Sequence, residues 1–309
     1  MKILIELPTW LGDNVMVTPA IENIISHYNK PEITLIGSFV SSEALKNHPQ
    51  VVATHVINKR IISLYILARK LGKFDLFFSF RNSFRSTILK LFISSKDQFQ
   101  FDGSRYQNRH QVEKYNDFVC ENIDTNLLAG KLIVYPNSKF LTSNTKPTVG
   151  INPGASYGNA KRWYPEKFAQ VAAELSYHYE ILIFGGPDEK DIAADIEYLL
   201  VEMGVNNIRN LAGRTSIQEL ISRISSLDLF ISGDSGPMHL AASFQVPTVA
   251  IFGPTRDDET SQWMNSKSMI VKKNLDCQPC MKRACPLKHH NCMNLIEAED
   301  ILKAVQSLN

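Results

Sequence analysis

The 309-residue sequence has no long hydrophobic run and no leader-like N-terminus. Its longest apolar stretches, residues 61–68 and 246–252, are far shorter than the roughly 20 residues that a membrane-spanning helix needs. Glu6 and Pro8 interrupt the apolar N-terminal stretch, which argues against a signal peptide. We therefore expect a cytoplasmic protein whose five cysteines are mostly reduced.

Signatures of several other functions are missing as well. No Gly-x-Gly-x-x-Gly follows an expected strand, which disfavours a nicotinamide-dependent dehydrogenase. No helix-turn-helix, zinc-finger or RNA-recognition pattern is present, which disfavours nucleic acid as a partner. The sequence also has no Asp-x-Asp metal signature, internal repeat or low-complexity tract. The composition, 44% hydrophobic, is that of a packed globular protein.

The small net charge of +2 hides an uneven distribution. Residues 1–150 hold 18 Lys and Arg against 12 Asp and Glu, a net +6, whereas the remainder holds 15 against 19, a net −4. Most of the positive excess lies between Lys59 and Lys114. Because nucleic acid is disfavoured, this excess predicts that the first half of the chain binds a phosphorylated lipid.

Apolar runs of strand length alternate with helical stretches along the chain. In the first half we expect helices at 14–28, 61–71 and 84–94, and strands at 2–7, 33–37, 52–57 and 76–79. In the second half we expect helices at 165–177, 189–203 and 216–225, and strands at 148–151, 181–184, 208–210, 228–231 and 248–252. This alternation predicts an α/β protein with a doubly wound parallel sheet in each half.

A polar, proline-flanked segment at residues 136–147 separates the two halves. We place the hinge in this segment, which gives a first domain of residues 1–147 and a second of residues 148–309. The last helix is a candidate to pack back on the first domain. Two domains also fit the length, at roughly 150 residues per domain.

Residues 232–239 read Ser-Gly-Asp-Ser-Gly-Pro-Met-His and join an apolar strand to a helical stretch. Pro237 fits the first turn of that helix, where its missing N–H costs nothing. The free N–H groups of the turn form an anion site, and the small residues let a ligand approach the backbone. Asp234 and His239 would lie beside that anion. An ordinary strand–turn–helix connection is the alternative.

Two further junctions carry residues of the same kinds. Gly12-Asp13 lies in a loop that follows the first strand and enters a helix. Residues 152–165 follow another strand and contain two glycines, Lys161, Arg162 and a helix start at Pro165, which together suit a diphosphate. Ligands of open α/β sheets bind at the carboxyl ends of strands, where all three junctions are expected.

The chain resembles one family in the order and spacing of five elements: Gly12-Asp13, Thr18-Pro19-Ala20-Ile21, Asn152-Pro153-Gly154-Ala155, Lys161-Arg162-Trp163 and residues 233–239. They are similar to those of the ADP-heptose:lipopolysaccharide heptosyltransferases of glycosyltransferase family 9, and most similar to the members that add the second heptose. The resemblance covers essentially the whole chain. It implies the GT-B architecture, two Rossmann-like domains that face a central cleft.

The resemblance also implies the reaction and its partners. The expected activity is inverting, metal-independent transfer of L-glycero-D-manno-heptose from ADP-heptose to the inner core of lipopolysaccharide, an acceptor built from Kdo, heptose and lipid A. Such an enzyme would work at the inner face of the cytoplasmic membrane, held peripherally by an anionic surface. A family-9-like transferase with another nucleotide sugar or acceptor, or a non-catalytic nucleotide-sugar-binding module, are the alternatives.

Roles for individual residues follow from the same resemblance. The first domain binds the acceptor and carries the base, Asp13, and the second domain binds the donor. Lys161 is the second catalytic residue, which stabilises the departing diphosphate. The donor site is expected to contain Ser156, Lys161, Asp234, Ser235, Gly236 and His239. From the residues alone, Asp13 could instead cap a helix, Lys161 could be a solvated surface residue, and His239 could simply face its helix neighbours.

Arg81, Asn82 and Arg85 follow an expected strand and are the candidate acceptor-binding residues, with Arg109 on a later polar loop. Arginine suits fixed, bidentate contact with phosphate or carboxylate. A solvated basic surface is the alternative for each residue, but an acidic acceptor explains the cluster better.

The C-terminal region carries Cys277-x2-Cys280-x4-Cys285-x6-Cys292, with His289 and His290 between the last two cysteines. Four thiols could bind a structural zinc ion. Because the spacing departs from paired Cys-x2-Cys knuckles, we expect reduced thiols or an occasional disulfide, and no cofactor. Zinc stays the less favoured alternative.

Overall fold

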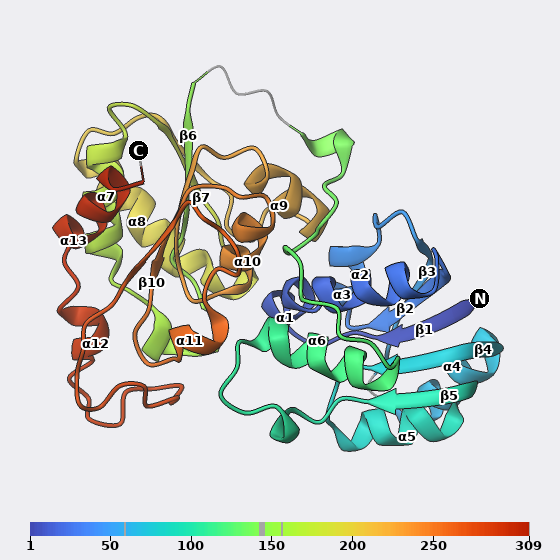
Figure 1. Ribbon diagram of the computed structural model, residues 1–309. Coiled ribbons are helices and arrows are strands. Elements are labelled where there is room, and N and C mark those ends of the chain that lie inside the picture. Colours follow the sequence, from blue (N-terminus) through green and yellow to red (C-terminus); the bar gives the residue numbers. More distant parts are fainter. Residues whose placement is uncertain (59, 142–145, 156, 309) are drawn as a thin grey trace. The chain divides into compact units, whose positions relative to one another are not determined.

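The computed structural model describes residues 1–58, 60–141, 146–155 and 157–308 (Figure 1). The chain divides into two compact units, Met1–Tyr135 and Pro136–Asn309. This division falls at the start of the polar segment in which the sequence places the hinge. Each unit is built on one parallel sheet flanked by helices.

The sheet of the first unit has the order β3-β2-β1-β4-β5, with all neighbours parallel. Its strands are β1 (Lys2–Glu6), β2 (Glu32–Gly37), β3 (Val51–Val56), β4 (Lys73–Ser79) and β5 (Ser94–Gln100). Its α-helices are α1 (Leu11–Met16), α2 (Thr18–His27), α3 (Phe39–Leu45), α4 (Ile61–Leu71), α5 (Phe84–Phe92) and α6 (Gln111–Asn122). Central strand β1 is buried from its second residue onward, as expected for a parallel strand covered on both faces.

The single helix expected at residues 14–28 is two helices that meet at Val17. Pro19 stands at the start of α2 and has no N–H to donate to the helix before it. The Thr18 hydroxyl instead donates to the Val15 carbonyl oxygen at 2.7 Å, which satisfies a group at the end of α1.

Helices α4 and α5 pack on one face of the first sheet. Leu64 and Ala68 of α4 and Leu89 of α5 pack with Leu4 and Phe77 of the strands in one buried cluster. The rings of Tyr65 and Phe92 lie 5.4 Å apart, which places the outer surfaces of the two helices side by side.

The sheet of the second unit has the order β11-β10-β9-β6-β7-β8, again with parallel neighbours. Its strands are β6 (Thr148–Asn152), β7 (Glu180–Ile183), β8 (Ile208–Asn210), β9 (Leu229–Gly233), β10 (Thr248–Ile251) and β11 (Ser268–Val271). Its α-helices are α7 (Pro165–Leu175), α8 (Lys190–Glu202), α9 (Ile217–Ile224), α10 (Gly236–Ser243), α11 (Asp257–Thr260), α12 (Asn291–Asn294) and α13 (Ala298–Gln306).

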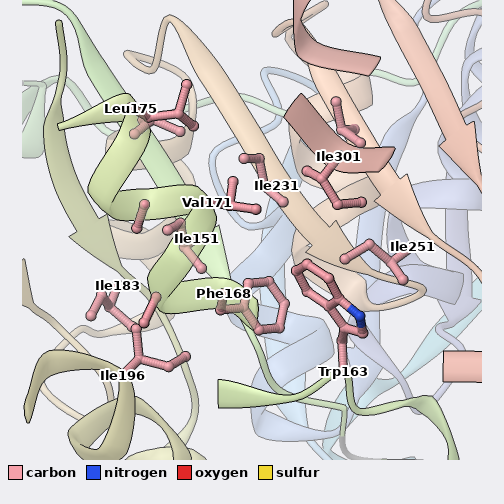
Figure 2. Close-up of a cluster of buried hydrophobic side chains, with 14 of the residues drawn as sticks. Ile151, Trp163, Phe168, Val171, Leu175, Ile183, Ile196, Ile231, Ile251 and Ile301 are labelled. Atoms are coloured by element: carbon pink, nitrogen blue, oxygen red, sulfur yellow. The ribbon is translucent and has the colours of Figure 1, made fainter. Parts of the chain in front are cut away.

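A large hydrophobic core of the second unit lies between this sheet and helices α7, α8 and α13 (Figure 2). Phe168 and Val171 of α7 face Ile151 and Ile231 of the central strands, and Trp163 packs edge-on against Phe168. The last helix, α13, packs against α7, β10 and β11 within this unit, through residues such as Ile301.

In both sheets the strand order reverses beside the first strand of the unit. The chain runs β1, β2, β3 in one direction and then crosses to β4 on the other side of β1; it repeats this course with β6, β7, β8 and then β9. Ligands of doubly wound folds bind at such switch points, outside the carboxyl ends of the strands. Loops 7–10 and 80–83 lie at the first switch point, and residues 153–155, 157–164 and 234–235 lie at the second.

Within the described ranges, the structure contains no helix that is both long and apolar enough to cross a membrane.

Candidate active site

The loops after β6 and β9 are joined by polar contacts at the switch point of the second unit. Asn152, the last residue of β6, donates from Nδ2 to the Ser235 hydroxyl at 3.2 Å. The hydroxyl groups of Ser232 and Ser235 lie 2.9 Å apart. These contacts fix the chain where α10 begins.

Lys161 forms an ion pair at this edge of the sheet. Its Nζ lies 2.6 Å from Asp234 Oδ2 and also donates to the Asp234 carbonyl oxygen at 3.3 Å. The Thr255 hydroxyl donates to the same carboxylate oxygen at 2.7 Å. Only 13% of the Lys161 side chain and 8% of the Asp234 side chain are exposed. Lys161 is therefore a largely buried, paired cation rather than a solvated surface residue.

Helix α10 starts with Gly236 and Pro237, and Ser235 occupies the position before it. The Ser235 side chain bonds to Asn152 and does not cap the helix. His239 lies within the first turn and is buried. A helix start whose N–H groups are not covered by a capping side chain favours an anion. The structure thus places Lys161, Asp234, Ser235, Gly236 and His239 at the same edge of the sheet. Ser156 lies outside the described residues.

Gly158 shapes the loop that carries Lys161. Its φ of +153° is one that residues with a side chain rarely adopt, and a Cβ atom there would lie 2.4 Å from the Arg283 carbonyl oxygen. The Ala160 N–H donates to this same carbonyl at 3.1 Å. The loop therefore rests on the chain around Arg283.

Asp13 lies in the first turn of α1, directly after the loop from β1. Trp10, not Asp13, occupies the N-cap position, so the alternative role of Asp13 as a helix cap is excluded. The Tyr115 hydroxyl of α6 donates to Asp13 Oδ1 at 3.3 Å. Burial, followed by the charge of Asp13, raises the pKa of Tyr115 well above its usual value, so Tyr115 keeps its proton.

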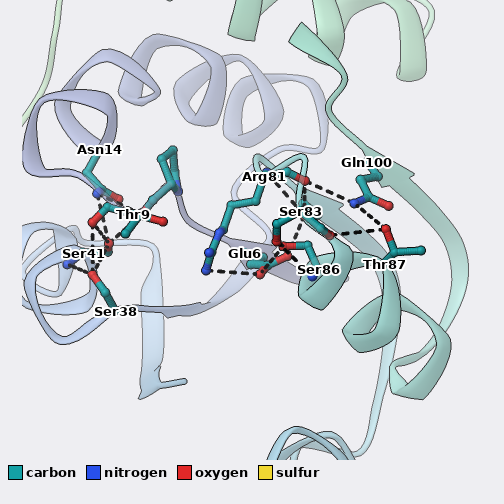
Figure 3. Close-up of polar contacts among 12 residues, drawn as sticks. Glu6, Thr9, Asn14, Ser38, Ser41, Arg81, Ser83, Ser86, Thr87 and Gln100 are labelled. Atoms are coloured by element: carbon teal, nitrogen blue, oxygen red, sulfur yellow. Dashed lines mark hydrogen bonds and ion pairs between the residues drawn. The ribbon is translucent and has the colours of Figure 1, made fainter. Parts of the chain in front are cut away.

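The loop between β1 and α1 is held from the side by Asn14 and Ser41 (Figure 3). Asn14 Nδ2 donates to the Ser41 hydroxyl at 3.0 Å, and that hydroxyl donates to the Pro8 carbonyl oxygen at 2.6 Å. Both side chains are buried. This network fixes the entry into α1 and hence the place of Asp13.

Glu6 is a buried carboxylate at the carboxyl end of β1, and sequence analysis did not find it. It accepts hydrogen bonds from the hydroxyl groups of Ser79 at 2.6 Å and Ser86 at 2.9 Å, and it pairs with Arg81 Nη1 at 3.7 Å (Figure 3). Burial raises its pKa above the ordinary value, although Ser79, Arg81, Ser86 and Arg85 all oppose this shift. The sequence signal that could have indicated Glu6 is its position as a charged residue at the end of an apolar strand.

The predicted acceptor-binding residues fall into two groups. Arg81 and Arg85 lie near Glu6, at the end of β4 and in α5. Asn82 is exposed beside them and donates to Asp102 Oδ1 at 3.1 Å. Arg109 belongs to a separate group, because it forms ion pairs with the acidic residues Asp117 and Glu113 of α6.

Comparisons with known proteins place the whole chain in one family. A family model for glycosyltransferase family 9 (heptosyltransferase) matches residues 65–291. Lipooligosaccharide heptosyltransferase 2 of Campylobacter jejuni (serotype O:2) is 40% identical, over 100% of this chain and 98% of its own. Lipopolysaccharide heptosyltransferase 2 of Escherichia coli K12 is 24% identical, over 100% of this chain and 98% of its own.

Among solved structures, that of Escherichia coli ADP-heptose heptosyltransferase II is similar with a TM-score of 0.84 at 23% identity, covering 100% of this chain and 98% of that one. This similarity confirms the predicted GT-B fold of two Rossmann-like units. Together with the full-length identity and the family model, it leads to one conclusion: the chain belongs to glycosyltransferase family 9, the heptosyltransferases.

Proposed function

We propose that this protein transfers L-glycero-D-manno-heptose from ADP-heptose to the inner core of lipopolysaccharide, and that it adds the second heptose. The observation that carries this proposal is the 40% identity with a heptosyltransferase 2 over the full chain. Ligand-type residues at both switch points support it, because each unit then holds one substrate at the edge where its fold binds ligands.

The second unit would bind the donor. Its diphosphate is an anion, and the start of α10 together with the Lys161 ammonium supplies the matching positive potential. Asp234 holds Lys161 in place before the donor arrives, and Thr255 in turn holds the Asp234 carboxylate. As the bond between the heptose and the diphosphate breaks, negative charge grows on the departing ADP. Preorganised N–H groups and the ammonium stabilise that charge without a metal ion.

Asp13 would act as the base. It takes the proton from the acceptor hydroxyl while the hydroxyl oxygen forms a bond to the anomeric carbon of heptose. The electron pair of the breaking bond leaves with ADP, so attack from the opposite side inverts the anomeric configuration. The Tyr115 hydrogen bond orients the carboxylate for this transfer.

Arg81, Asn82 and Arg85 would bind the acidic groups of the acceptor, its phosphates and carboxylates. Glu6 pairs with Arg81 and so sets the position of its guanidinium, which makes Glu6 a positioning residue. Arg109 is less suited to this role because two carboxylates already neutralise it.

Profiling of nucleotide sugars tests the donor. The full-length protein should bind ADP and turn over ADP-heptose, and UDP- and GDP-sugars should be poor substrates. Lys161→Met should weaken ADP binding, whereas Asp13→Asn should leave it intact. Efficient turnover of another nucleotide sugar would instead identify a family-9 transferase of different specificity, and binding without any turnover would identify a non-catalytic module.

The outer surface of α4 and α5 would hold the protein peripherally at the anionic inner face of the cytoplasmic membrane. Six large hydrophobic side chains are exposed on these helices: Ile61, Ile62, Tyr65 and Ile66 of α4, and Phe84 and Leu91 of α5, the last two by 81% and 78%. Basic residues accompany them on or next to the same helices: Arg60, Arg69, Lys70, Arg85 and Lys90. The apolar side chains can insert into the lipid surface, and each basic residue near anionic lipids contributes about 1 kcal/mol of attraction.

Vesicle flotation tests the membrane proposal. The protein should bind vesicles that contain phosphatidylglycerol and should dissociate as salt rises. The triple variant Ile62→Ser/Phe84→Ser/Leu91→Ser should lose this binding, whereas Tyr177→Ser, at an equally exposed position of the second unit, should keep it. Unchanged binding by the triple variant would contradict the proposal.

A further inference from the structure

Residues 272–290, between β11 and α12, form a long segment without helix or strand. Large side chains within it, such as Met281 and Leu287, are exposed rather than buried. Irregular segments of this length are uncommon in compact units and need another source of order. A covalent or metal clip that closes such a loop is one of the few remaining sources.

The segment supports the donor-site loops through backbone contacts. Tyr157 donates from its hydroxyl to the Met281 carbonyl oxygen at 2.7 Å, and the Met281 N–H donates to the Pro254 carbonyl oxygen at 2.9 Å. Ala160 bonds to the Arg283 carbonyl as described above. Whatever orders residues 272–290 therefore also orders the loops that carry Lys161 and Thr255.

Four cysteines gather around one small cavity beside these contacts. Cys277, Cys280, Cys285 and Cys292 all line it, and all four are free thiols. The cavity measures ≈ 20 Å³, which is room for about one water-sized species. The spacing in the sequence separates these cysteines by up to fifteen residues, so only the fold brings them to a common point.

The surroundings of the sulfur atoms suit thiolates. Backbone N–H groups of residues 287–290 hydrogen-bond to the Cys285 sulfur. The other three cysteines lie near enough to Cys292 to interact with it electrostatically. A shared cation stabilises thiolates that lie this close together.

Both ring nitrogens of the neighbouring His290 are engaged: Nε2 contacts the Ala160 carbonyl oxygen at 2.9 Å and Nδ1 contacts the Tyr164 hydroxyl at 3.1 Å. His289 also lines the cavity, and its Nδ1 accepts the Asn291 N–H. The four sulfur atoms that line the cavity are the candidate ligands.

We propose that Cys277, Cys280, Cys285 and Cys292 bind one thiolate-preferring metal ion, zinc or iron, and that this structural centre fixes residues 272–290 beneath the donor loops. Tetrahedral sulfur sites of this kind hold zinc or iron. Among the described residues, no three His, Cys, Asp or Glu side chains already stand in the arrangement of a metal centre, so the thiols must close around the ion as it binds.

Metal analysis of the full-length protein, purified under reducing and anaerobic conditions, tests the proposal. We expect one zinc or iron per chain, and X-ray absorption should show sulfur ligands and distinguish the two metals. Cys280→Ser and Cys292→Ser should each lose the metal. Cys120→Ser is the matched control, because Cys120 lies in α6 of the first unit, and it should keep the full complement.

Chelation of the wild-type protein gives a second readout that does not depend on the folding of a variant. Removal of the metal should raise the number of thiols that react with an aromatic disulfide reagent and lower the melting temperature, and Zn²⁺ or Fe²⁺ should restore both. Far less than one metal per chain, with no uptake by the reduced protein, would overturn the proposal, as would a native disulfide among the four cysteines. These measurements need no substrate, so a negative result for the metal would not count against the proposed transferase activity. Only the inferred link between the metal centre and the donor loops rests on that proposed function.

Discussion

Replacement of Lys161 by methionine tests the donor half of the site most sharply. The ammonium is lost while the length and apolar stem of the side chain are largely kept. The change leaves the Asp234 carboxylate, 8% exposed, without its cation; among the residues that the structure describes, the Thr255 hydroxyl remains as its side-chain donor. Two effects follow, one on stability and one on nucleotide binding.

The cost in stability follows from the burial of the pair. Removal of one partner of a buried ion pair typically costs about 3–5 kcal/mol, because the other charge stays desolvated. Thr255 still donates to Asp234, so we place Lys161→Met at the lower end, about 3 kcal/mol. The double variant Lys161→Met/Asp234→Asn removes both charges and should recover about half of that loss.

The effect on binding is estimated from the lost contact with the diphosphate. A hydrogen bond to a charged group contributes about 1.5–3 kcal/mol, which corresponds to a roughly 10- to 150-fold weaker Kd for ADP. Urea unfolding and calorimetry with ADP measure the two effects. Lys167→Met is the matched control, because Lys167 forms its ion pair with Glu297 and not with Asp234, so the ADP affinity of this variant should be unchanged. Equal ADP affinity in both variants, with no coupling between Lys161 and Asp234, would refute the reasoning.

Three further substitutions test other parts of the account. Asp13→Asn should lower kcat by about 10²–10⁴-fold, as expected for loss of a general base, with ADP affinity intact; a kcat within a few-fold of the parent would remove the assignment. Glu6→Gln tests the buried carboxyl, whose pKa is raised above 4.5 by burial. The parent protein should therefore lose stability relative to the variant as pH rises from 4.5 toward neutrality. Urea midpoints of the two proteins that run parallel across that range would contradict this. Gly158→Ala should cost about 1–3 kcal/mol and weaken ADP binding, because the new Cβ meets the Arg283 carbonyl oxygen; a variant as stable as the parent would show that the loop can relax.

The sequence predicts the parts of the fold that local pattern determines. The buried strand β9 and the Gly-Asp-Ser-Gly-Pro junction after it form one continuous signal, and the structure places that junction at a switch point. Edge strand β5 escaped prediction because its sequence, Ser-Ser-Lys-Asp-Gln-Phe-Gln, is polar on both faces. Helix α6 was also missed, although the spacing of Val112, Tyr115 and Val119 and the capping box at His110 were readable signals.

Pairings between distant residues are what the sequence does not reveal. Tyr115 reaches Asp13 across 102 positions, and Ser79 reaches Glu6 across 73, so no local pattern indicates either contact. The same limit explains the ion pair of Lys161 with Asp234, across 73 positions. In each case the fold brings together groups that the chain separates.

The central claim is that the protein transfers heptose from ADP-heptose to the lipopolysaccharide inner core and adds the second heptose. The most direct measurement compares the release of ADP from ADP-heptose with defined inner-core acceptors that carry no heptose or one, together with mass analysis of the products. The account predicts rapid release and a gain of one heptose with the acceptor that carries one heptose, and little of either with the acceptor that carries none. Absence of turnover with both acceptors by folded, ADP-binding protein would contradict it.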